Sequence, residues 1–340
     1  AGVFFGRAFQ IREICNRITA ADAAPILLVY GESGVGKSSL LAAGVLPRLE
    51  SSHRVEYLRR DPALGLLGTL MQCLDAGADV LEMQAAWRRA ETGKPLLVVL
   101  DQAEEAFTRP MAAPQQELTD FFDALQALFG TAGARPRGRL ILGFRKEWLP
   151  EFEARLAERR LPKEHQFLQT LDRRGIVAAI EGPTRREKLH ATYGLTVDEG
   201  LAAEIADDLL ADPESPVAPT LQILLTKLWH EARQQDDAQP RFTRALYLQL
   251  KRSGILLQDF LDQQLAEVER WRPEIIQSGL ALDLLAFHTT AKGTAQQRTA
   301  EELLEAYAHA GGDLPEIIRR FGYLMADIPS QRRGAPRGTR

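Results

Sequence analysis

Short apolar runs alternate with helical patterns along the first part of the chain. Four runs rich in Val, Ile and Leu predict buried strands, at Ile26–Tyr30, Val55–Leu58, Leu96–Leu100 and Leu140–Phe144. Apolar residues at helical spacing predict helices between them, at Lys37–Leu49, Leu64–Leu74, Val80–Ala90 and Glu117–Phe129. Strands of this kind, alternating with helices, are typical of a parallel sheet with helices on both faces. The pattern therefore predicts a three-layer α/β domain.

After Arg145 the strand signal fades and helical periodicity dominates. Apolar residues at helical spacing recur at Gly175–Ile180, Leu201–Leu210 and Leu221–Ala232. Residues 211–219 and 234–242 are rich in Pro and polar residues, which predicts internal loops. The block 275–328 has the pattern of a helix, a polar turn, two helices and a short strand. That order predicts a winged-helix-like module.

These patterns divide the chain into four segments. We expect an α/β domain over residues 1–165, an all-helical domain over 166–236, a winged-helix-like domain over 237–328 and a disordered tail over 329–340. The tail is rich in Pro, Gly and Arg and lacks the apolar residues of a core. Because the sequence begins without Met and ends in this tail, we expect it to be the central part of a larger protein.

Composition narrows the class of protein. Hydrophobic residues make up 45% and charged residues 26% of the chain, as in ordinary globular proteins. The net charge of −4 argues against nucleic acid as the main partner, because such proteins neutralise phosphates with basic surfaces. Cys15 and Cys73 have neither metal-ligand nor disulfide spacing, and no apolar run reaches the ~20 residues that span a bilayer. We therefore expect a cytoplasmic protein without zinc or a membrane span.

The stretch ILLVYGESGVGKSSLL, from Ile26 to Leu41, contains the most specific motif of the chain. Gly31, Gly36, Lys37 and Ser38 fit the pattern G-x-x-x-x-G-K-[ST], between a predicted strand and a predicted helix. In this pattern backbone N–H groups surround the phosphates, the lysine reaches the β- and γ-phosphates, and the serine hydroxyl coordinates Mg²⁺. The motif predicts a binding loop for ATP or ADP with Mg²⁺, made of Gly31, Ser33, Gly34, Val35, Gly36, Lys37, Ser38 and Ser39.

Acidic residues follow the predicted strand Leu96–Leu100. Asp101 lies directly after it, at the carboxyl end where parallel α/β sheets bind ligands. A carboxylate there can hold Mg²⁺ directly or through water, so we assign the metal to Ser38 and Asp101. Glu104 and Glu105 follow within one turn. Either could orient or deprotonate an attacking water, and we prefer Glu105.

Arg145 is the first residue after the predicted strand Leu140–Phe144. A guanidinium at this strand end could donate hydrogen bonds to the γ-phosphate and so distinguish ATP from ADP. Together with Lys37, Asp101 and one of the two glutamates, Arg145 completes the predicted catalytic set.

Four further segments carry a resemblance to a known family. They are FFGR at Phe4–Arg7, DQAEE at Asp101–Glu105, FRKEWL at Phe144–Leu149 and VAPTLQILLTKLW at Val217–Trp229. With the phosphate loop they resemble the additional-strand ATPases and, more specifically, the bacterial novel STAND branch of signal-transducing NTPases, which is related to NACHT and NB-ARC switches. The resemblance covers about residues 4–328.

The resemblance implies further site residues. Phe5, Gly6 and Arg7 would pack near the adenine, and Pro219 would touch the base. The block 275–328 would be the winged-helix domain that stabilises the inactive form. His288 lies in that block, where some relatives have a histidine on the bound diphosphate, but it has no secure counterpart in the motif.

The resemblance also implies a slow switch rather than a metabolic enzyme. ADP would hold a closed state, and exchange for ATP would open it and expose surfaces for self-association. The full-length protein would carry an N-terminal effector domain and a C-terminal sensor domain, in relatives often for antiphage defence. Neither a membrane nor a nucleic acid is the expected partner of this segment.

Three other functions fit parts of the pattern. An origin-recognition-like AAA+ ATPase would act on DNA through its winged helix, although the expected recognition helix, Thr299–Gly311, is acidic. A small-molecule kinase would need a substrate lid with converging arginines. A scaffold that binds nucleotide only for stability would hydrolyse none.

Overall fold

The computed structural model describes residues 4–76, 80–111, 113–211, 216–252, 265–266, 268–287 and 300–307. The chain divides into two compact units. The first comprises Ala1–Gln222 and Ala232–Thr243, and the second comprises Ile223–Glu231 and Arg244–Arg340. Within the described residues, no helix is both long enough and apolar enough to cross a membrane.

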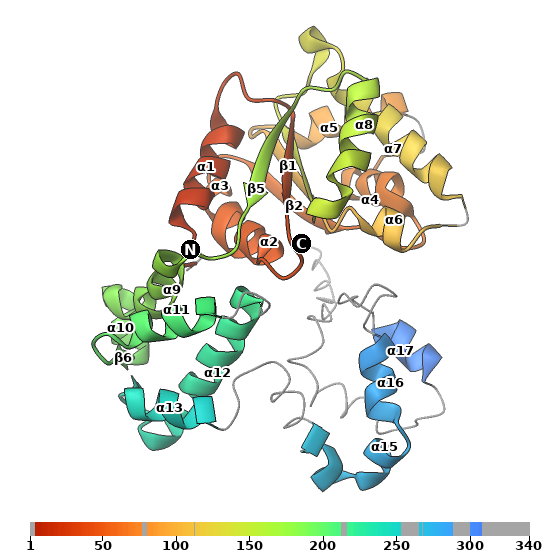
Figure 1. Cartoon of the computed structure of the whole chain (residues 1–340). Coiled ribbons are helices and arrows are strands. Elements are labelled where there is room, and N and C mark those ends of the chain that lie inside the picture. Colours follow the sequence, from red (N-terminus) through yellow and green to blue (C-terminus); the bar gives the residue numbers. More distant parts are fainter. Residues whose placement is uncertain are drawn as a thin grey trace, which may run out of the picture. The chain divides into compact units, whose positions relative to one another are not determined.

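A five-stranded parallel sheet forms the centre of the first unit (Figure 1). Its strands are β1 (Ile26–Gly31), β2 (Arg54–Arg59), β3 (Leu96–Asp101), β4 (Arg139–Arg145) and β5 (Lys163–Leu168). Their spatial order is β2-β3-β4-β1-β5, so β4 lies between β1 and β3. This insertion is the arrangement expected of an additional-strand ATPase. The carboxyl ends of β1, β3 and β4, which follow one another across the sheet, therefore lie along one edge.

The edge strand β5 was absent from the sequence prediction for a physical reason. Among the residues that the structure describes it pairs only with β1, and its sequence KEHQFL has no apolar run. Lys163 and His165 turn to one face, where both contact Glu153 of α8 (Leu149–Glu158) at 3.1 and 2.9 Å. Only Gln166 and Leu168 of this strand are buried. A half-solvated edge strand therefore lacks the pattern by which central strands are recognised.

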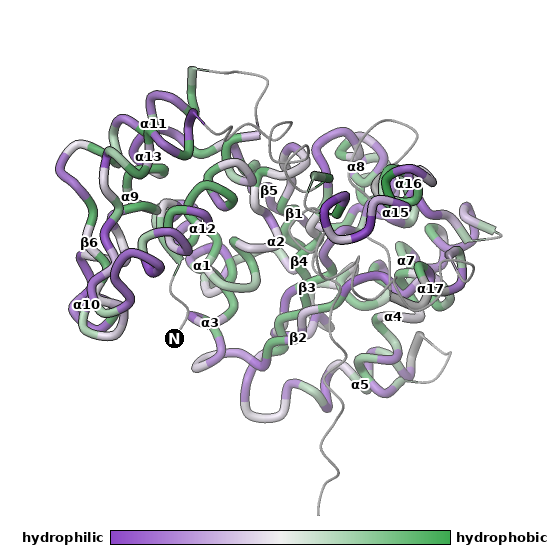
Figure 2. Tube along the Cα trace, turned by 90° about the horizontal axis from the view of Figure 1, so that it is seen from below, coloured by the Kyte–Doolittle hydropathy of each residue, from purple (hydrophilic) through white to green (hydrophobic). Residues whose placement is uncertain are grey.

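Helices cover both faces of the sheet, as Figure 1 shows. One face packs against α4 (Gly65–Leu74), α5 (Val80–Ala90), α7 (Pro114–Phe129) and α8 (Leu149–Glu158). The other packs against α1 (Ala8–Thr19) and the helix that follows the phosphate loop. Alternate residues of each strand enter the two cores; for example, Leu28 belongs to the first and Val29 to the second. The central strands are accordingly hydrophobic along their length (Figure 2).

The helix predicted over residues 37–49 forms, but not as one regular α-helix. It consists of α2 (Lys37–Ser39), π-helical turns over Leu40–Val45, and α3 (Leu46–Leu49). Pro47 cannot donate to the residue four before it, and its ring would clash with that carbonyl, so a regular ladder is interrupted there. Gly44 also allows close packing, because a Cβ there would lie 2.9 Å from Ile11.

A helical region completes the first unit. It contains α9 (Arg173–Arg185), α10 (Glu187–Tyr193), α11 (Leu201–Ala211) and α12 (Val217–Gln235), of which residues 223–231 belong to the second unit. A short parallel pair joins β6 (Thr196–Val197) to β7 (Arg241–Phe242). The two predicted loops are too long: α12 already begins at Val217, and β7 ends the second of them. Proline at the start of α12 is compatible with a helix, because the first-turn N–H groups need no partner within the helix.

The second unit is helical where the structure describes it. Its helices are α13 (Arg244–Arg252), α15 (Pro273–Gln277), α16 (Leu280–Phe287) and α17 (Ala300–Ala306). A small core gathers Val268, Ile275, Ala281, Leu284 and Leu303. His288, the strand predicted near residue 323 and the tail 329–340 lie outside the described residues. The predicted winged-helix arrangement therefore stays a prediction.

Candidate functional site

The phosphate loop leaves β1 at Gly31 and enters α2 at Lys37. Gly34 and Gly36 have φ angles of +73° and +93°, which glycine adopts without strain. A Cβ added to Gly36 would meet nothing within 4 Å, whereas one on Gly31 would lie 2.4 Å from the carbonyl oxygen of Leu168. Glycine is therefore required by conformation at Gly34 and Gly36 and by the packing of β5 at Gly31.

The remaining predicted binding residues of the loop lie in the same short segment. Ser33 and Ser39 are exposed, Ser38 is half-buried and Val35 is buried. The serine hydroxyls are thus accessible to a ligand, while Val35 anchors the loop in the core.

Lys37 folds back over the loop that precedes it. Its Nζ donates hydrogen bonds to the carbonyl oxygens of Gly31 at 3.0 Å and Glu32 at 2.8 Å. Burial lowers the pKa of Lys37, and the carboxylates of Glu104 and Asp101 oppose that shift. These acids act on Lys37 electrostatically because the strand ends bring them close.

Asp101 ends β3 and is 1% exposed. Tyr57 of β2 donates its hydroxyl to Oδ2 of Asp101 at 2.5 Å. The other oxygen, Oδ1, is buried and, among the described residues, receives no hydrogen bond. Gly143 of β4 makes room for it, because a Cβ there would lie 2.7 Å from Oδ1.

A carboxylate with an unsatisfied buried oxygen fits a site for Mg²⁺. Mg²⁺ at a phosphate site takes one or two protein oxygens and completes its shell with water and phosphate. Asp101 and the hydroxyl of Ser38 would supply those oxygens. The described part of the chain contains no cluster of three or more His, Cys, Asp or Glu side chains that could hold a metal by themselves.

The turn after β3 directs Glu104 inward. Gln102 has a φ of +59°, and the N–H of Ala103 donates to the carbonyl of Gly143 at 2.9 Å. Glu104 is 5% exposed, and its Oε1 lies 3.2 Å from Nε of Arg145. Burial raises the pKa of Glu104 to about 7, although Lys37 and Arg145 act in the opposite direction. Gln102, a non-glycine residue in the left-handed region, thus lies in the turn that brings Glu104 to Arg145.

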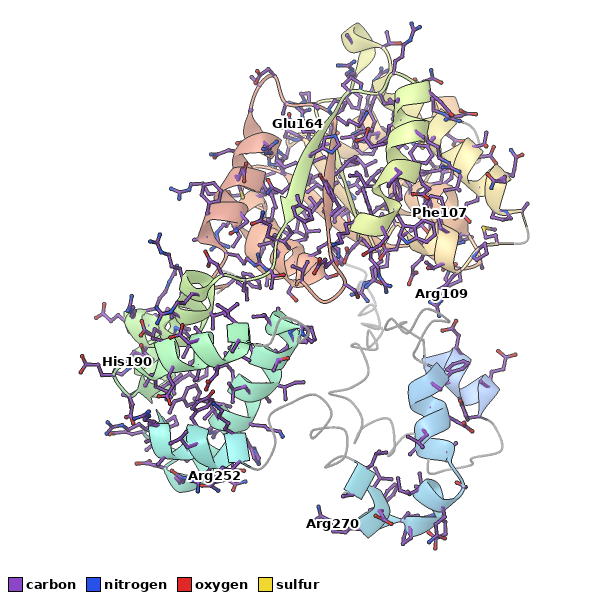
Figure 3. All side chains as sticks on the ribbon, viewed as in Figure 1. Phe107, Arg109, Glu164, His190, Arg252 and Arg270 are labelled. Atoms are coloured by element: carbon purple, nitrogen blue, oxygen red, sulfur yellow. The ribbon has the colours of Figure 1, made fainter. Side chains whose placement is uncertain are left out.

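Glu105 is placed differently from Glu104. It begins α6 (Glu105–Thr108), and its Oε1 lies 3.7 Å from Nη1 of Arg109, which directly follows this helix (Figure 3). The electrostatic neighbours of Lys37 include Glu104 and Asp101 but not Glu105. The geometry therefore favours Glu104 as the acid beside the phosphate loop, whereas the sequence led us to prefer Glu105.

The FFGR segment lies against the phosphate loop and α9. Arg7 donates to the carbonyl oxygens of Val35 at 2.9 Å and Gln169 at 2.6 Å. A Cβ on Gly6 would lie 2.4 Å from the carbonyl oxygen of Gly175, and one on Gly182 would lie 2.2 Å from the Phe5 ring. Phe5 and Gly6 therefore pack on α9.

Pro219 lies beside the phosphate loop. A Cβ added to Gly34 would be 3.3 Å from Cγ of Pro219. This contact brings the first turn of α12 next to the loop, within the first unit. Pro219 and the FFGR segment both border the loop, as a base-binding role for them would require.

A family model described as Novel STAND NTPase 1 matches residues 1–322. The chain belongs to this family. Its members are P-loop NTPases, and nucleotide binding is the function that the family implies.

Two solved structures are similar to this novel STAND NTPase at low sequence identity. The ORC2 protein of Aeropyrum pernix in its ADP form is 15% identical, with a TM-score of 0.50 over 93% of this chain and 84% of that one. The ORC1 protein of the same organism in complex with DNA is 15% identical, with a TM-score of 0.48 over 95% of this chain and 85% of that one. No curated protein sequence matches the chain. The likeness to ORC2 extends to the fold alone.

Two residues of this novel STAND NTPase site were missed in the sequence. Tyr57 sits in an ordinary strand pattern, where a tyrosine is typical of a core, so nothing distinguished it. Gly143 did carry a signal: glycine inside a buried strand often marks the close approach of another group. Here that group is the carboxylate of Asp101.

Proposed function

We propose that this novel STAND NTPase is a nucleotide-dependent switch that binds ATP and ADP with Mg²⁺ and hydrolyses ATP slowly. One observation carries the proposal: Lys37, Asp101, Glu104 and Arg145 meet beside an open glycine-rich loop, where β1, β3 and β4 end. Two cationic side chains, Lys37 and Arg145, lie there beside two acidic ones, Asp101 and Glu104. A triphosphate with Mg²⁺ would enter a site that already supplies opposite charge for each of its parts.

Each group has a role that its position supports. The loop N–H groups and Lys37 would bind the β- and γ-phosphates, and Ser38 and Asp101 would hold Mg²⁺, which neutralises charge on the phosphate oxygens. Tyr57 fixes the Asp101 carboxylate through Oδ2. Phe5, Gly6, Arg7 and Pro219 would border the base.

Hydrolysis would proceed by attack of water on the γ-phosphorus. The new P–O bond forms as the bond to the β-phosphate oxygen breaks, giving ADP and inorganic phosphate. Glu104 would accept a proton from the attacking water through Oε2, which is buried and accepts no hydrogen bond from the residues that the structure describes. Arg145 would stabilise the charge on the γ-phosphate.

A switch needs nucleotide to bind its two states with different affinity. Changing a population from 1:99 to 99:1 requires about 10⁴-fold discrimination, or about 5.5 kcal/mol. One charged hydrogen bond from Arg145 to a γ-phosphate supplies about 1.5–3 kcal/mol. ATP alone would therefore leave this chain largely inactive, and other contacts, from a sensor or from self-association, would complete the transition.

The wider role of the chain follows the same proposal. Residues 1–165 would be the nucleotide-binding domain, 166–236 the helical domain, 237–328 a winged-helix-like domain and 329–340 a linker. An N-terminal effector and a C-terminal sensor would flank them in a cytoplasmic protein that self-associates on activation and acts in antiphage defence.

Nucleotide binding by the wild type and by Lys37→Ala tests the proposal. Isothermal titration with ADP and with a non-hydrolysable ATP analogue, each with Mg²⁺, should give binding to the wild type that is lost or strongly weakened in Lys37→Ala. The variant should keep its thermal midpoint without added nucleotide, because Lys37 Nζ donates its hydrogen bonds within the described residues to the loop carbonyls of Gly31 and Glu32. A wild type that binds neither nucleotide would contradict the proposal, and tight binding of duplex DNA would favour the origin-recognition alternative.

A further inference from the structure

Arg7 joins three segments that are distant in the sequence. Its side chain is 4% exposed. Nη2 donates to the carbonyl of Val35 in the phosphate loop, and Nη1 donates to the carbonyl of Gln169, which follows β5. Burial lowers the pKa of Arg7, and the nearby Asp172 only partly opposes this. Burying a guanidinium on neutral carbonyls is unfavourable unless the hydrogen bonds are well made, so both contacts are specific.

The carbonyl that Arg7 holds determines the direction of a neighbouring N–H. The C=O of Val35 and the N–H of Gly36 belong to one peptide unit, and the described residues contain no cis peptide bond. In a planar trans peptide these two groups point in opposite directions. Because Arg7 fixes the carbonyl on its own side, the N–H of Gly36 points away from Arg7.

Gly36 borders the open part of the loop. Its φ is +93°, and a Cβ there would meet nothing within 4 Å. The next residue, Lys37, turns its ammonium back over the loop carbonyls of Gly31 and Glu32. Backbone N–H groups directed into such a concave loop bind anions.

We propose that Arg7 is a positioning residue of the nucleotide site, which directs the N–H of Gly36 toward the phosphates by holding the carbonyl of Val35. This rests on the nucleotide binding proposed above. It differs from the base contact that the resemblance implies for Arg7, because it acts on the phosphate end of the ligand. Its second hydrogen bond, to Gln169, joins the loop to the segment that leads into α9.

The test compares Arg7→Met and Arg7→Lys with a matched control, Arg12→Met. Arg12 lies on the exposed side of α1, so its removal changes charge without touching the loop. Three probes divide the ligand: ADP, adenosine as the phosphate-free part, and pyrophosphate as the base-free part. Titration gives each affinity, and the amide signal of Gly36 in ¹⁵N-glycine-labelled protein reports its N–H directly.

We expect Arg7→Met to lower the affinity for ADP and for pyrophosphate by about tenfold or more, which is the effect of losing one hydrogen bond to a charged group. Adenosine should bind within about twofold of the wild type, and the ADP-induced shift of the Gly36 amide should shrink. The affinities of Arg7→Lys should lie between those of Arg7→Met and the wild type. The lysine ammonium can reach one of the two carbonyls, but it lacks the planar guanidinium that holds both. Arg12→Met should match the wild type with every probe.

Two results would overturn the proposal. Unchanged ADP affinity and an unchanged Gly36 shift in Arg7→Lys and Arg7→Met would refute the positioning role while nucleotide binding stands. Equal losses of affinity for ADP and adenosine would mean that Arg7 acts on the base or on the stability of the whole protein. If Arg7→Met does not fold, Arg7→Lys decides by the same comparison. Failure of the proposed function itself would be distinct, because then the wild type would bind no ADP.

Discussion

Oε1 of Glu104 lies 3.2 Å from Nε of Arg145, so the buried acid with the larger electrostatic effect on Lys37 is paired with the arginine at the end of the neighbouring strand. The pair connects the turn after β3 with the end of β4, and both side chains act electrostatically on Lys37. Arg145 therefore has two possible anionic partners, the carboxylate of Glu104 and a γ-phosphate. The Glu104–Arg145 pair should therefore affect both hydrolysis and the affinity for ATP.

Hydrolysis should depend on Glu104 and not on Glu105. Glu104→Gln keeps the size of the side chain but removes the proton acceptor, so phosphate release should fall by about 10²–10⁴-fold. Glu105→Gln is the matched control, since Glu105 pairs with Arg109, the residue directly after α6, and it should change the rate by less than about threefold. A malachite-green assay of both variants measures this. A larger loss in Glu105→Gln would reverse the assignment.

The raised pKa of Glu104, about 7, predicts two effects of pH. Between its ordinary value of 4.5 and about 7, the folded protein holds a proton that the unfolded chain releases. Stability should therefore fall as pH rises through this window, with a slope of at most about 1.4 kcal/mol per pH unit from this group. Phosphate release should rise over the same range, because only the carboxylate accepts a proton. Denaturant titrations and rates from pH 4.5 to 8 test both, and Glu104→Gln should remove the contribution to the slope.

Gly143 should be essential for the position of Asp101. A Cβ at residue 143 would lie 2.7 Å from Oδ1 of Asp101, and both residues are buried. Gly143→Ala should destabilise the fold by about 1–3 kcal/mol, and weaken the dependence of nucleotide binding on Mg²⁺. Gly133→Ala is the control, because a Cβ there would meet nothing within 4 Å. Equal stability of the two variants in urea would contradict this packing.

The packing of Phe5 on α9 predicts non-additive effects of two substitutions. A Cβ at residue 182 would lie 2.2 Å from the Phe5 ring, so Gly182→Ala should destabilise the protein by about 1–3 kcal/mol. Phe5→Ala should destabilise it too, by loss of the contacts that the half-buried ring makes with α9. In the double variant the clash is absent, so its loss should be smaller than the sum of the single losses by at least about 0.5 kcal/mol. Additive losses would mean that the two residues do not meet.

Periodicity predicted the parts of this fold that are buried on all sides. β1, β3 and β4 are continuous apolar runs because helices cover both of their faces, and their predicted and observed bounds agree closely. β5 has polar residues because it lies at an edge and is half-solvated, so no local pattern reveals it. The site divides in the same way. The phosphate loop is local in sequence, whereas the choice between Glu104 and Glu105 depends on the left-handed turn at Gln102, which only the folded chain displays.

The pairing of Glu104 with Arg145 finally predicts how strongly a triphosphate binds. To bind a γ-phosphate, Arg145 must exchange its contact with Glu104 for one with the phosphate, so each ion pair weakens the other. Glu104→Gln removes the charge from the competing partner. Its affinity for a non-hydrolysable ATP analogue should therefore rise by about five- to tenfold, while its affinity for ADP, which has no γ-phosphate, should change by less than about twofold. Arg145→Met should lose the preference for the analogue, and Glu104→Gln should no longer raise the affinity in that background. Titration of the two single variants and the double variant with both nucleotides measures the coupling.

Because the analogue is not cleaved, a gain in affinity cannot come from slower hydrolysis. An equal gain for ADP and the analogue would show that Glu104 repels all nucleotides, and the exchange of partners by Arg145 would then be wrong.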